Sequence, residues 1–176
     1  MKKWGIGWGN TISGLKFEDK VDFLTLISQM KNYKVKGFDI YFCDKKVAQA
    51  YKKQQLYTYF LKPKNIDYRD YISAQLLPDN AIFVIIKNTM FIVEIKFQQV
   101  SGSVDEKLQT CWFKKMQYVK LLSHLNIQVE YCYVLSERFK DKKYNDVLNY
   151  IQAQKCCYFF ETLPLDYLWL PISDNE

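Results

Sequence analysis

The chain has 176 residues, of which 49% are hydrophobic and 25% are charged, so its composition is that of a globular protein and not of a disordered one. A single histidine, His124, excludes zinc sites built on several histidines, and the five cysteines contain no Cys-x-x-Cys pair that would indicate a structural zinc site. The odd cysteine count is typical of reduced thiols in a cytoplasmic protein, and no apolar run is long enough to span a membrane.

The net charge of +6 is distributed unevenly along the chain. Residues 1–70 contain 14 basic and 7 acidic residues, whereas residues 71–176 contain 11 basic and 12 acidic residues. This excess favours a polyanionic partner, and lysine-rich surface helices of a soluble protein are the alternative explanation. Only Arg69 and Arg138 are arginines, so few bidentate arginine contacts to guanine are available, which favours sites read by Asn, Gln or Lys.

The first part of the chain predicts two helices that flank a strand. Phe17–Met30 has the apolar spacing of an amphipathic helix, Gly37–Phe42 is typical of a strand, and Lys45–Leu56 is predicted to be a second, basic helix. The segment from Lys62 to Asn65 contains a proline and interrupts the pattern.

The clearest strand signal is a hairpin in the middle of the chain. Ala81–Ile86 and Met90–Phe97 are two apolar strands, joined by a turn at Lys87–Thr89. A polar loop follows, and Ser103 and Glu106 then fit a capping box that opens a helix.

That helix is predicted to run to about Ser123 and to bury one apolar face, which carries Leu108, Trp112, Met116 and Val119. The remaining predicted elements are the strand Ile127–Leu135, the helix Asp141–Gln154 and the short strand Cys156–Phe160. The order strand, strand, helix, strand, helix, strand indicates an α/β fold with a central mixed β-sheet flanked by helices.

Two charged residues, Glu94 and Lys96, interrupt the second hairpin strand. They are two positions apart and therefore point to the same face, where burial costs free energy unless each has a partner. The simplest explanation is that they pair with each other on an exposed face. If the turn centres on Asn88, position 82 faces 94 and position 80 faces 96, so Asp79 lies beside the same end of the hairpin.

Asp79 and Glu94 together would offer carboxylate oxygens to Mg²⁺, a hard cation. Lys96 would position the attacking water and offset charge in the transition state. This arrangement suits metal-assisted phosphodiester hydrolysis, and it needs no histidine.

These residues resemble a known signature. Pro78-Asp79, fourteen residues and then Glu94-Ile95-Lys96 are similar to the PD-(D/E)xK nuclease motif, and the stretch from Glu94 to Lys107 resembles type II restriction endonucleases. Residues 9–18 are also similar to the way in which many of these enzymes begin their first core helix. The resemblance covers about residues 9–135, and it implies a restriction-endonuclease-like core.

The resemblance implies a Mg²⁺-dependent, sequence-specific endonuclease that hydrolyses double-stranded DNA, with Asp79 and Glu94 as metal ligands and Lys96 assisting the nucleophile. One nuclease domain would span residues 1–176, with a basic helical N-terminal part at 1–75 and the catalytic hairpin and core at 76–160. Expected partners are double-stranded DNA, a second copy of the chain in a homodimer, and a cognate DNA methyltransferase, with no membrane.

The other candidate site residues each have two interpretations. By the same resemblance, Glu18 reaches the metal site; otherwise it is an acid favoured at the start of a helix. Gln98 either contacts the scissile phosphate or a metal-bound water, or ends a strand. Ser101, Ser103 and Lys107 lie near the start of a helix, where backbone amides are suited to bind a phosphate. The carboxylates of Asp105 and Glu106 compete for the same amides.

Two other functions remain open. One is a DNA-repair or junction-resolving nuclease of the same fold, and the other is a nucleic-acid-binding module without catalysis.

Overall fold

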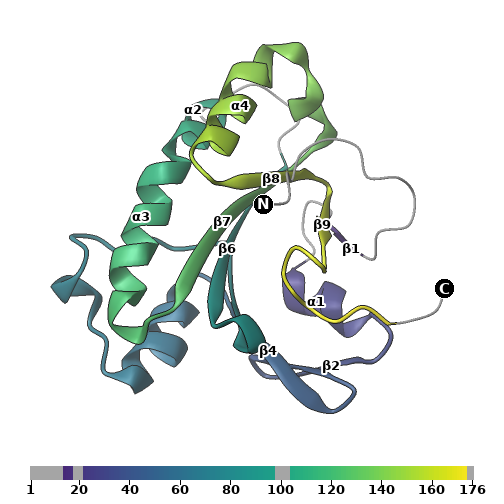
Figure 1. Cartoon of the computed structure of the whole chain (residues 1–176), viewed down its shortest axis with the longest axis vertical. Coiled ribbons are helices and arrows are strands. Elements are labelled where there is room, and N and C mark those ends of the chain that lie inside the picture. Colours follow the sequence, from purple (N-terminus) through teal and green to yellow (C-terminus); the bar gives the residue numbers. More distant parts are fainter. Residues whose placement is uncertain (1–13, 18–21, 98–103, 174–176) are drawn as a thin grey trace.

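A computed structural model describes residues 14–17, 22–97 and 104–173, with the side chains of residues 104 and 105 excepted. Its centre is a seven-stranded sheet of order β2-β3-β4-β5-β6-β7-β8, and β1 and β9 form a separate two-stranded sheet (Figure 1). The strands are β1 (Gly14–Lys16), β2 (Tyr33–Lys36), β3 (Asp39–Phe42), β4 (Lys45–Tyr51), β5 (Asn80–Val84), β6 (Thr89–Lys96), β7 (Gln128–Leu135), β8 (Cys157–Phe160) and β9 (Thr162–Pro164).

The α-helices are α1 (Phe23–Ser28), α2 (Val104–Lys107), α3 (Cys111–Leu122) and α4 (Asn145–Ala153), and a π-helix, η1 (Leu56–Leu61), follows β4. Short 3₁₀ turns are η2 (Lys62–Lys64), η3 (Tyr68–Asp70), η4 (Ile85–Lys87), η5 (Leu108–Thr110), η6 (Ser123–Leu125), η7 (Glu137–Lys140) and η8 (Lys142–Tyr144). None of the helices in the described residues is both long and apolar enough to cross a membrane.

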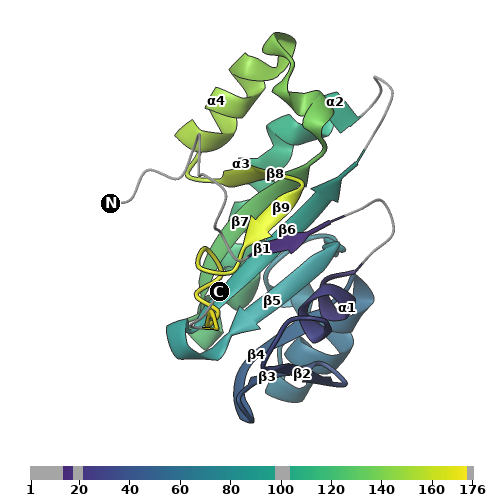
Figure 2. The same ribbon diagram turned by 90° about the vertical axis from the view of Figure 1, so that its right-hand side faces the viewer.

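The sheet is mixed, as the order of the predicted elements indicates. Strands β2 to β6 pair antiparallel, whereas β6, β7 and β8 pair parallel through the crossovers that contain α3 and α4. The α/β class and the mixed central sheet are therefore confirmed. Figure 2 shows β2–β4 and α1 at one end of the sheet and α2 and α4 at the other.

A separate apolar core covers each face of the sheet. Leu56 and Phe60 of η1, Tyr118 and Leu121 of α3 and Ile151 of α4 pack in one core, on the face to which Met90 and Ile92 of β6 point. The opposite core contains α1, the β1–β9 pair and the segment that follows β9. Because side chains alternate along a strand, Glu94 and Lys96 share the face of Ile92, beneath α3.

The prediction of a helix at Lys45–Leu56 is wrong, since Lys45–Tyr51 forms strand β4. Ala48 and Ala50 are buried between β3 and β5, and β4 supplies a ladder to both neighbours. Pairing on two sides outweighs the helix preference of the lysines and alanines. Within the described part of residues 1–75, the predicted helical character therefore holds only for α1 and the turns from η1 to η3.

The helix predicted at Phe17–Met30 is shorter than expected. In the described residues, α1 spans Phe23–Ser28, and Asp22 caps it by accepting a hydrogen bond from the Thr25 amide at 2.9 Å. Phe17 lies after β1 and donates its amide to the Glu161 carbonyl. The apolar spacing of this segment therefore combines a strand end with a short helix.

The prediction for the 104–123 helix is correct in extent and wrong in its buried face. The 3₁₀ turn η5 separates α2 from α3, and its tighter winding changes which side chains face the sheet. Leu108 is buried as expected, but Trp112 is 42% and Val119 is 36% exposed. Cys111, Tyr118, Leu121 and Leu122 fill the core instead.

The remaining predictions agree with the structure to within a few residues. The hairpin forms from β5 and β6, and β7, α4 and β8 occupy the expected segments. Gly37–Phe42 contributes strand β3, whereas β2 and β9 were not expected. All five cysteines are free, in line with the expected reduced thiols.

Candidate active site at the end of the β5–β6 hairpin

The register of the hairpin places Asp79 opposite Glu94. The expected pairing of 82 with 94 is incorrect, because Ile82 pairs with Phe91 and Asn80 with Val93. The register thus differs from the expected one by three residues. Extending the observed pairing by one position beyond the Asn80–Val93 pair brings Asp79 across from Glu94. The tight turn at Asn88, which adopts a left-handed conformation with φ of 46°, sets this register.

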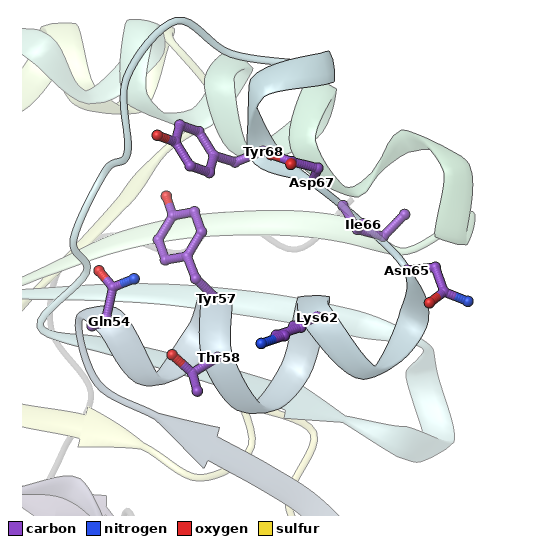
Figure 3. Close-up of a pocket in the computed structure, with 8 residues that line it drawn as sticks. All are labelled: Gln54, Tyr57, Thr58, Lys62, Asn65, Ile66, Asp67 and Tyr68. Atoms are coloured by element: carbon purple, nitrogen blue, oxygen red, sulfur yellow. The ribbon is translucent and has the colours of Figure 1, made fainter.

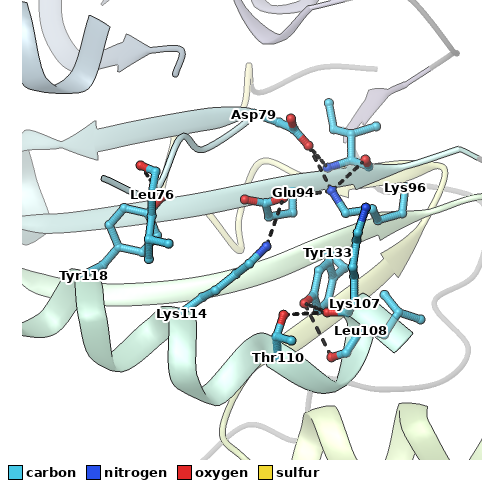
Figure 4. A network of polar contacts seen from close by, with 11 residues as sticks. Leu76, Asp79, Glu94, Lys96, Lys107, Leu108, Thr110, Lys114, Tyr118 and Tyr133 are labelled. Atoms are coloured by element: carbon cyan, nitrogen blue, oxygen red, sulfur yellow. Dashed lines mark hydrogen bonds and ion pairs between the residues drawn. The ribbon is translucent and has the colours of Figure 1, made fainter. Parts of the chain in front are cut away.

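Asp79, Glu94 and the carbonyl of Ile95 converge on the ammonium group of Lys96 (Figure 4). Lys96 Nζ lies 2.8 Å from Glu94 Oε2, 3.2 Å from Asp79 Oδ2 and 3.3 Å from the Ile95 carbonyl oxygen. The Ile95 amide also donates to Asp79 Oδ2 at 2.9 Å, which fixes the carboxylate against β6. The three residues of the predicted site are therefore together.

The site is largely buried, which corrects one part of the simpler interpretation of the strand charges. Glu94 and Lys96 do pair, but their side chains are only 8% and 14% exposed, so the expected exposed face is absent. Asp79, at 34% exposed, forms the open rim. Burial alone would lower the pKa of Lys96, yet the adjacent Glu94 and Asp79 carboxylates outweigh it and raise that pKa, which keeps the ammonium charged.

The oxygen donors fit a hard divalent cation. Two carboxylates and one peptide carbonyl already surround the Lys96 ammonium, and Mg²⁺ is commonly held by one or two carboxylates with water completing its shell. Among the described residues, no group of three His, Cys, Asp or Glu side chains comes together. Asp79, Glu94 and the Ile95 carbonyl could supply oxygens to Mg²⁺, which would compete with Lys96 for them.

Two tyrosines hold the segment that leads into Asp79. Tyr57 of η1 donates its hydroxyl to the Leu76 carbonyl at 2.8 Å and accepts from the Leu76 amide at 2.9 Å. Tyr118 of α3 donates to the same carbonyl at 3.2 Å. Burial raises the pKa of Tyr57 to about 12, so its hydroxyl stays protonated. Helices on the sheet face thus position the aspartate through the backbone three residues before it.

Sequence reasoning missed Lys114, which approaches the site from α3. Its ammonium lies 3.8 Å from Glu94 Oε2, and its side chain is 25% exposed (Figure 4). The two negative charges of Asp79 and Glu94 are thus matched by the two positive charges of Lys96 and Lys114. In the sequence, Lys114 was recognisable only as a lysine on the helix that follows the hairpin. Because η5 changes the helical phase, the sequence did not indicate which face of the helix Lys114 occupies.

The other expected site residues have different outcomes. Lys107 ends α2, where its carbonyl accepts a hydrogen bond from Tyr133, and its side chain extends towards the strand end that carries Lys96 (Figure 4). Glu18, Gln98, Ser101 and Ser103 lie outside the described residues. His124 packs edge-on against Tyr71.

Comparison of the chain with protein-family models, with curated proteins and with solved structures finds no match. The functional argument therefore depends on the geometry of the site itself.

Proposed function

We propose that the chain is a Mg²⁺-dependent endonuclease that hydrolyses phosphodiester bonds in double-stranded DNA. The observation that carries this proposal is the convergence of Asp79, Glu94 and the Ile95 carbonyl on one cationic position, with the Lys96 ammonium among them. The resemblance to the PD-(D/E)xK signature and the mixed sheet with its antiparallel catalytic hairpin support a restriction-endonuclease-like core.

The residues of the site have separate tasks in this reaction. Asp79 and Glu94 supply negative charge for Mg²⁺, which as a Lewis acid would polarise the phosphate and lower the pKa of a bound water. Lys96 holds a positive charge where the phosphate gains negative charge in the transition state, in a site with little water around it. The Ile95 amide keeps Asp79 in place throughout.

The distribution of charge supports a nucleic-acid substrate. The basic excess of residues 1–70 extends to the site, because the Lys53 amide donates to the carbonyl of Pro78, next to Asp79, at 2.8 Å. The backbone of the basic segment at Lys53 therefore lies beside the residue that precedes Asp79. A polyanion drawn to this segment would be brought close to the carboxylates.

The direct test is cleavage of supercoiled and linear plasmid in Mg²⁺, with EDTA as the blank. Asp79→Asn keeps an acceptor for the Ile95 amide, and Glu94→Gln keeps the shape of the glutamate, so each removes charge without a large change in volume. We expect each to reduce cleavage by orders of magnitude while folding and DNA binding persist. Binding without metal is expected to improve, since a carboxylate near a phosphate is repulsive.

Matched controls come from ion pairs elsewhere in the protein. Asp44→Asn removes an exposed aspartate that pairs with Lys34, and Glu130→Gln removes a glutamate on β7 that pairs with Lys115. Both should cut DNA normally. Wild-type rates in Asp79→Asn and Glu94→Gln would refute the active site.

The same digestion separates the functions that share this fold. Discrete fragments with one shared end sequence support a type II restriction enzyme, which as a homodimer would carry one site for each strand and would act beside a cognate DNA methyltransferase. Cutting confined to branched substrates supports a junction-resolving nuclease instead. DNA binding without cutting in any divalent metal supports a binding module.

A further inference from the structure

A polar groove lies between the π-helix η1 and the segment of residues 65–68 that follows it. It has a volume of about 480 Å³ and is lined by Gln54, Tyr57, Thr58, Lys62, Asn65 and Tyr68, among others (Figure 3). This volume falls within the roughly 300–1,000 Å³ of sites that hold small ligands. None of these residues touches Asp79, Glu94 or Lys96 directly, and Tyr57 alone also holds the segment that leads into Asp79.

Local sequence explains how the groove is built. Leu56, Phe60 and Leu61 of η1 are buried against the sheet, which leaves Thr58 and Lys62 on the outer side. The helical stretch ends at Asn65, which adopts a left-handed conformation with φ of 57°, and the chain turns back. Tyr68 then packs edge-on against Tyr57, with ring centroids 5.7 Å apart, and closes the groove on one side. Single π-helical turns often occur at functional sites.

The lining has hydrogen-bonding capacity that the protein does not use. The side chains of Gln54, Thr58, Lys62 and Asn65 have no hydrogen-bond or ion-pair partner among the described residues, and all four are exposed. Asp67, by contrast, is held by Arg69. Two amides, a hydroxyl and an ammonium are thus free for a ligand that has both an anionic group and a pattern of donors and acceptors.

The charge around the groove indicates a polyanion. Residues 52–69 contain five basic residues and one acidic residue, a net charge of +4. The acidic residue is Asp67, whose charge Arg69 neutralises. An acidic phosphate backbone therefore fits this segment better than a neutral small molecule.

The groove lies close to the proposed active site. Gln54 follows Lys53, whose amide bonds to the carbonyl of Pro78, and Asp79 follows Pro78. With consecutive Cα atoms 3.8 Å apart, Gln54 is within about 13 Å of Asp79. Successive nucleotides rise about 3.4 Å in a duplex, so a strand cut at Asp79 places a nucleotide a few positions away beside Gln54.

Both arginines, the usual readers of guanine, have partners in the protein. Arg69 binds Asp67, and Arg138 donates to the Tyr144 hydroxyl. Asparagine and glutamine side chains form bidentate pairs with the edge of adenine. The groove presents one of each, Gln54 and Asn65, on either side of Lys62 (Figure 3).

We propose that this groove seats one nucleotide of the DNA strand near the cleavage site, with Lys62 on its phosphate and Gln54 and Asn65 on its base. The groove is then a determinant of sequence preference, and this inference rests on the proposed endonuclease function.

The test compares sequence preference, and not rate alone, between wild type and groove variants. A plasmid library with randomised sites is digested in Mg²⁺ and the cut ends are sequenced, and the same library is selected for binding in Ca²⁺. Gln54→Ala and Asn65→Gly remove the amides, and glycine accepts the left-handed backbone at position 65. Gln152→Ala, an exposed glutamine of α4, is the matched control.

We expect Gln54→Ala or Asn65→Gly to relax the preference at one base position by roughly 5- to 140-fold. Lys62→Ala should weaken binding evenly across sequences and reduce the salt slope by about one, whereas Lys120→Ala on α3 should not. Unchanged preference in both amide variants, or unchanged affinity in Lys62→Ala, overturns the inference.

The outcomes separate this inference from the proposed function. If the wild type cuts with a sequence preference and the groove variants keep that preference, only the inference about the groove is refuted. A wild type that binds a preferred sequence in Ca²⁺ but never cuts overturns the endonuclease, and the binding arm still decides on the groove. A wild type that neither binds nor cuts overturns both.

Discussion

Replacement of Lys96 by methionine tests the central feature of the proposed site, which is that the Lys96 ammonium and a divalent cation would share the same oxygens. Asp79 Oδ2 and Glu94 Oε2 lie 3.2 Å and 2.8 Å from Lys96 Nζ, so the two carboxylate oxygens are at most about 6 Å apart. At an effective dielectric constant near 20, two negative charges at that separation repel by about 3 kcal/mol. In the wild type, Lys96 offsets this repulsion.

Lys96→Met should therefore lose about 3 kcal/mol of stability in EDTA at pH 7. For a chain of this size, that loss lowers the melting temperature by roughly 6–12 °C. Mg²⁺ should restore most of the loss by mass action, and the Mg²⁺-induced shift should exceed that of the wild type, since the competing ammonium is gone. DNA cleavage should be abolished although the metal binds.

Thermal denaturation at increasing Mg²⁺ measures both effects without an activity assay. Lys115→Met is the control, because its ammonium is 11% exposed and pairs with Glu130 at 3.1 Å on the neighbouring strand. That variant is expected to lose stability that Mg²⁺ does not restore. If Lys96→Met melts like the wild type in EDTA, or if Mg²⁺ has the same effect on both, the shared-oxygen argument is wrong.

Three further outcomes follow from the geometry. Tyr57→Phe leaves the Leu76 amide without its hydrogen-bond acceptor, so it should cost about 1–3 kcal/mol of stability and slow cleavage. Tyr59→Phe, at a half-exposed position, should do neither, and equal melting curves for the two variants would refute the positioning role of Tyr57. Lys114→Met breaks only a long, partly exposed ion pair, so it should cost less than about 1 kcal/mol of stability. It should nevertheless lower the rate of single-turnover cleavage at saturating Mg²⁺ tenfold or more. An unchanged rate would mean that Lys114 serves only as a counter-charge for Glu94. DNA affinity should fall roughly a hundredfold between 50 and 200 mM salt if four phosphates are contacted, and a flat response would exclude the basic segment as the binding surface.

The proximity of Asp79, Glu94 and Lys96 was predictable because these three residues are close in sequence. A tight turn at Asn88 and two apolar strands suffice to bring Asp79 near Glu94 and Lys96, and no contact with a distant element is required. Even a register error of three residues left the same three side chains at the same end of the hairpin. Strands β7 and β8 were predictable for a related reason, since residues 131–135 of β7 and all of β8 are continuous apolar runs of strand length.

The elements that were mispredicted depend on neighbours that the sequence does not name. Lys45–Tyr51 has a lysine-rich start and small alanines, which suit a helix equally well, and only pairing with β3 and β5 makes it a strand. The buried face of α3 was wrong because a single 3₁₀ turn changed its phase. In both cases the local pattern was ambiguous, and tertiary packing decided between the alternatives.

These two errors concealed the residues that extend the site beyond the trio. With β4 as a helix, Lys53 has no reason to lie beside Pro78, and with the expected face of α3, Lys114 has no reason to point at Glu94. The structure corrects both: the backbone at Lys53 meets that of Pro78, and the Lys114 ammonium from α3 joins the carboxylate pair that the hairpin alone provides. In the proposed reaction, Lys114 and Lys96 would both offset negative charge that a phosphodiester brings to these carboxylates.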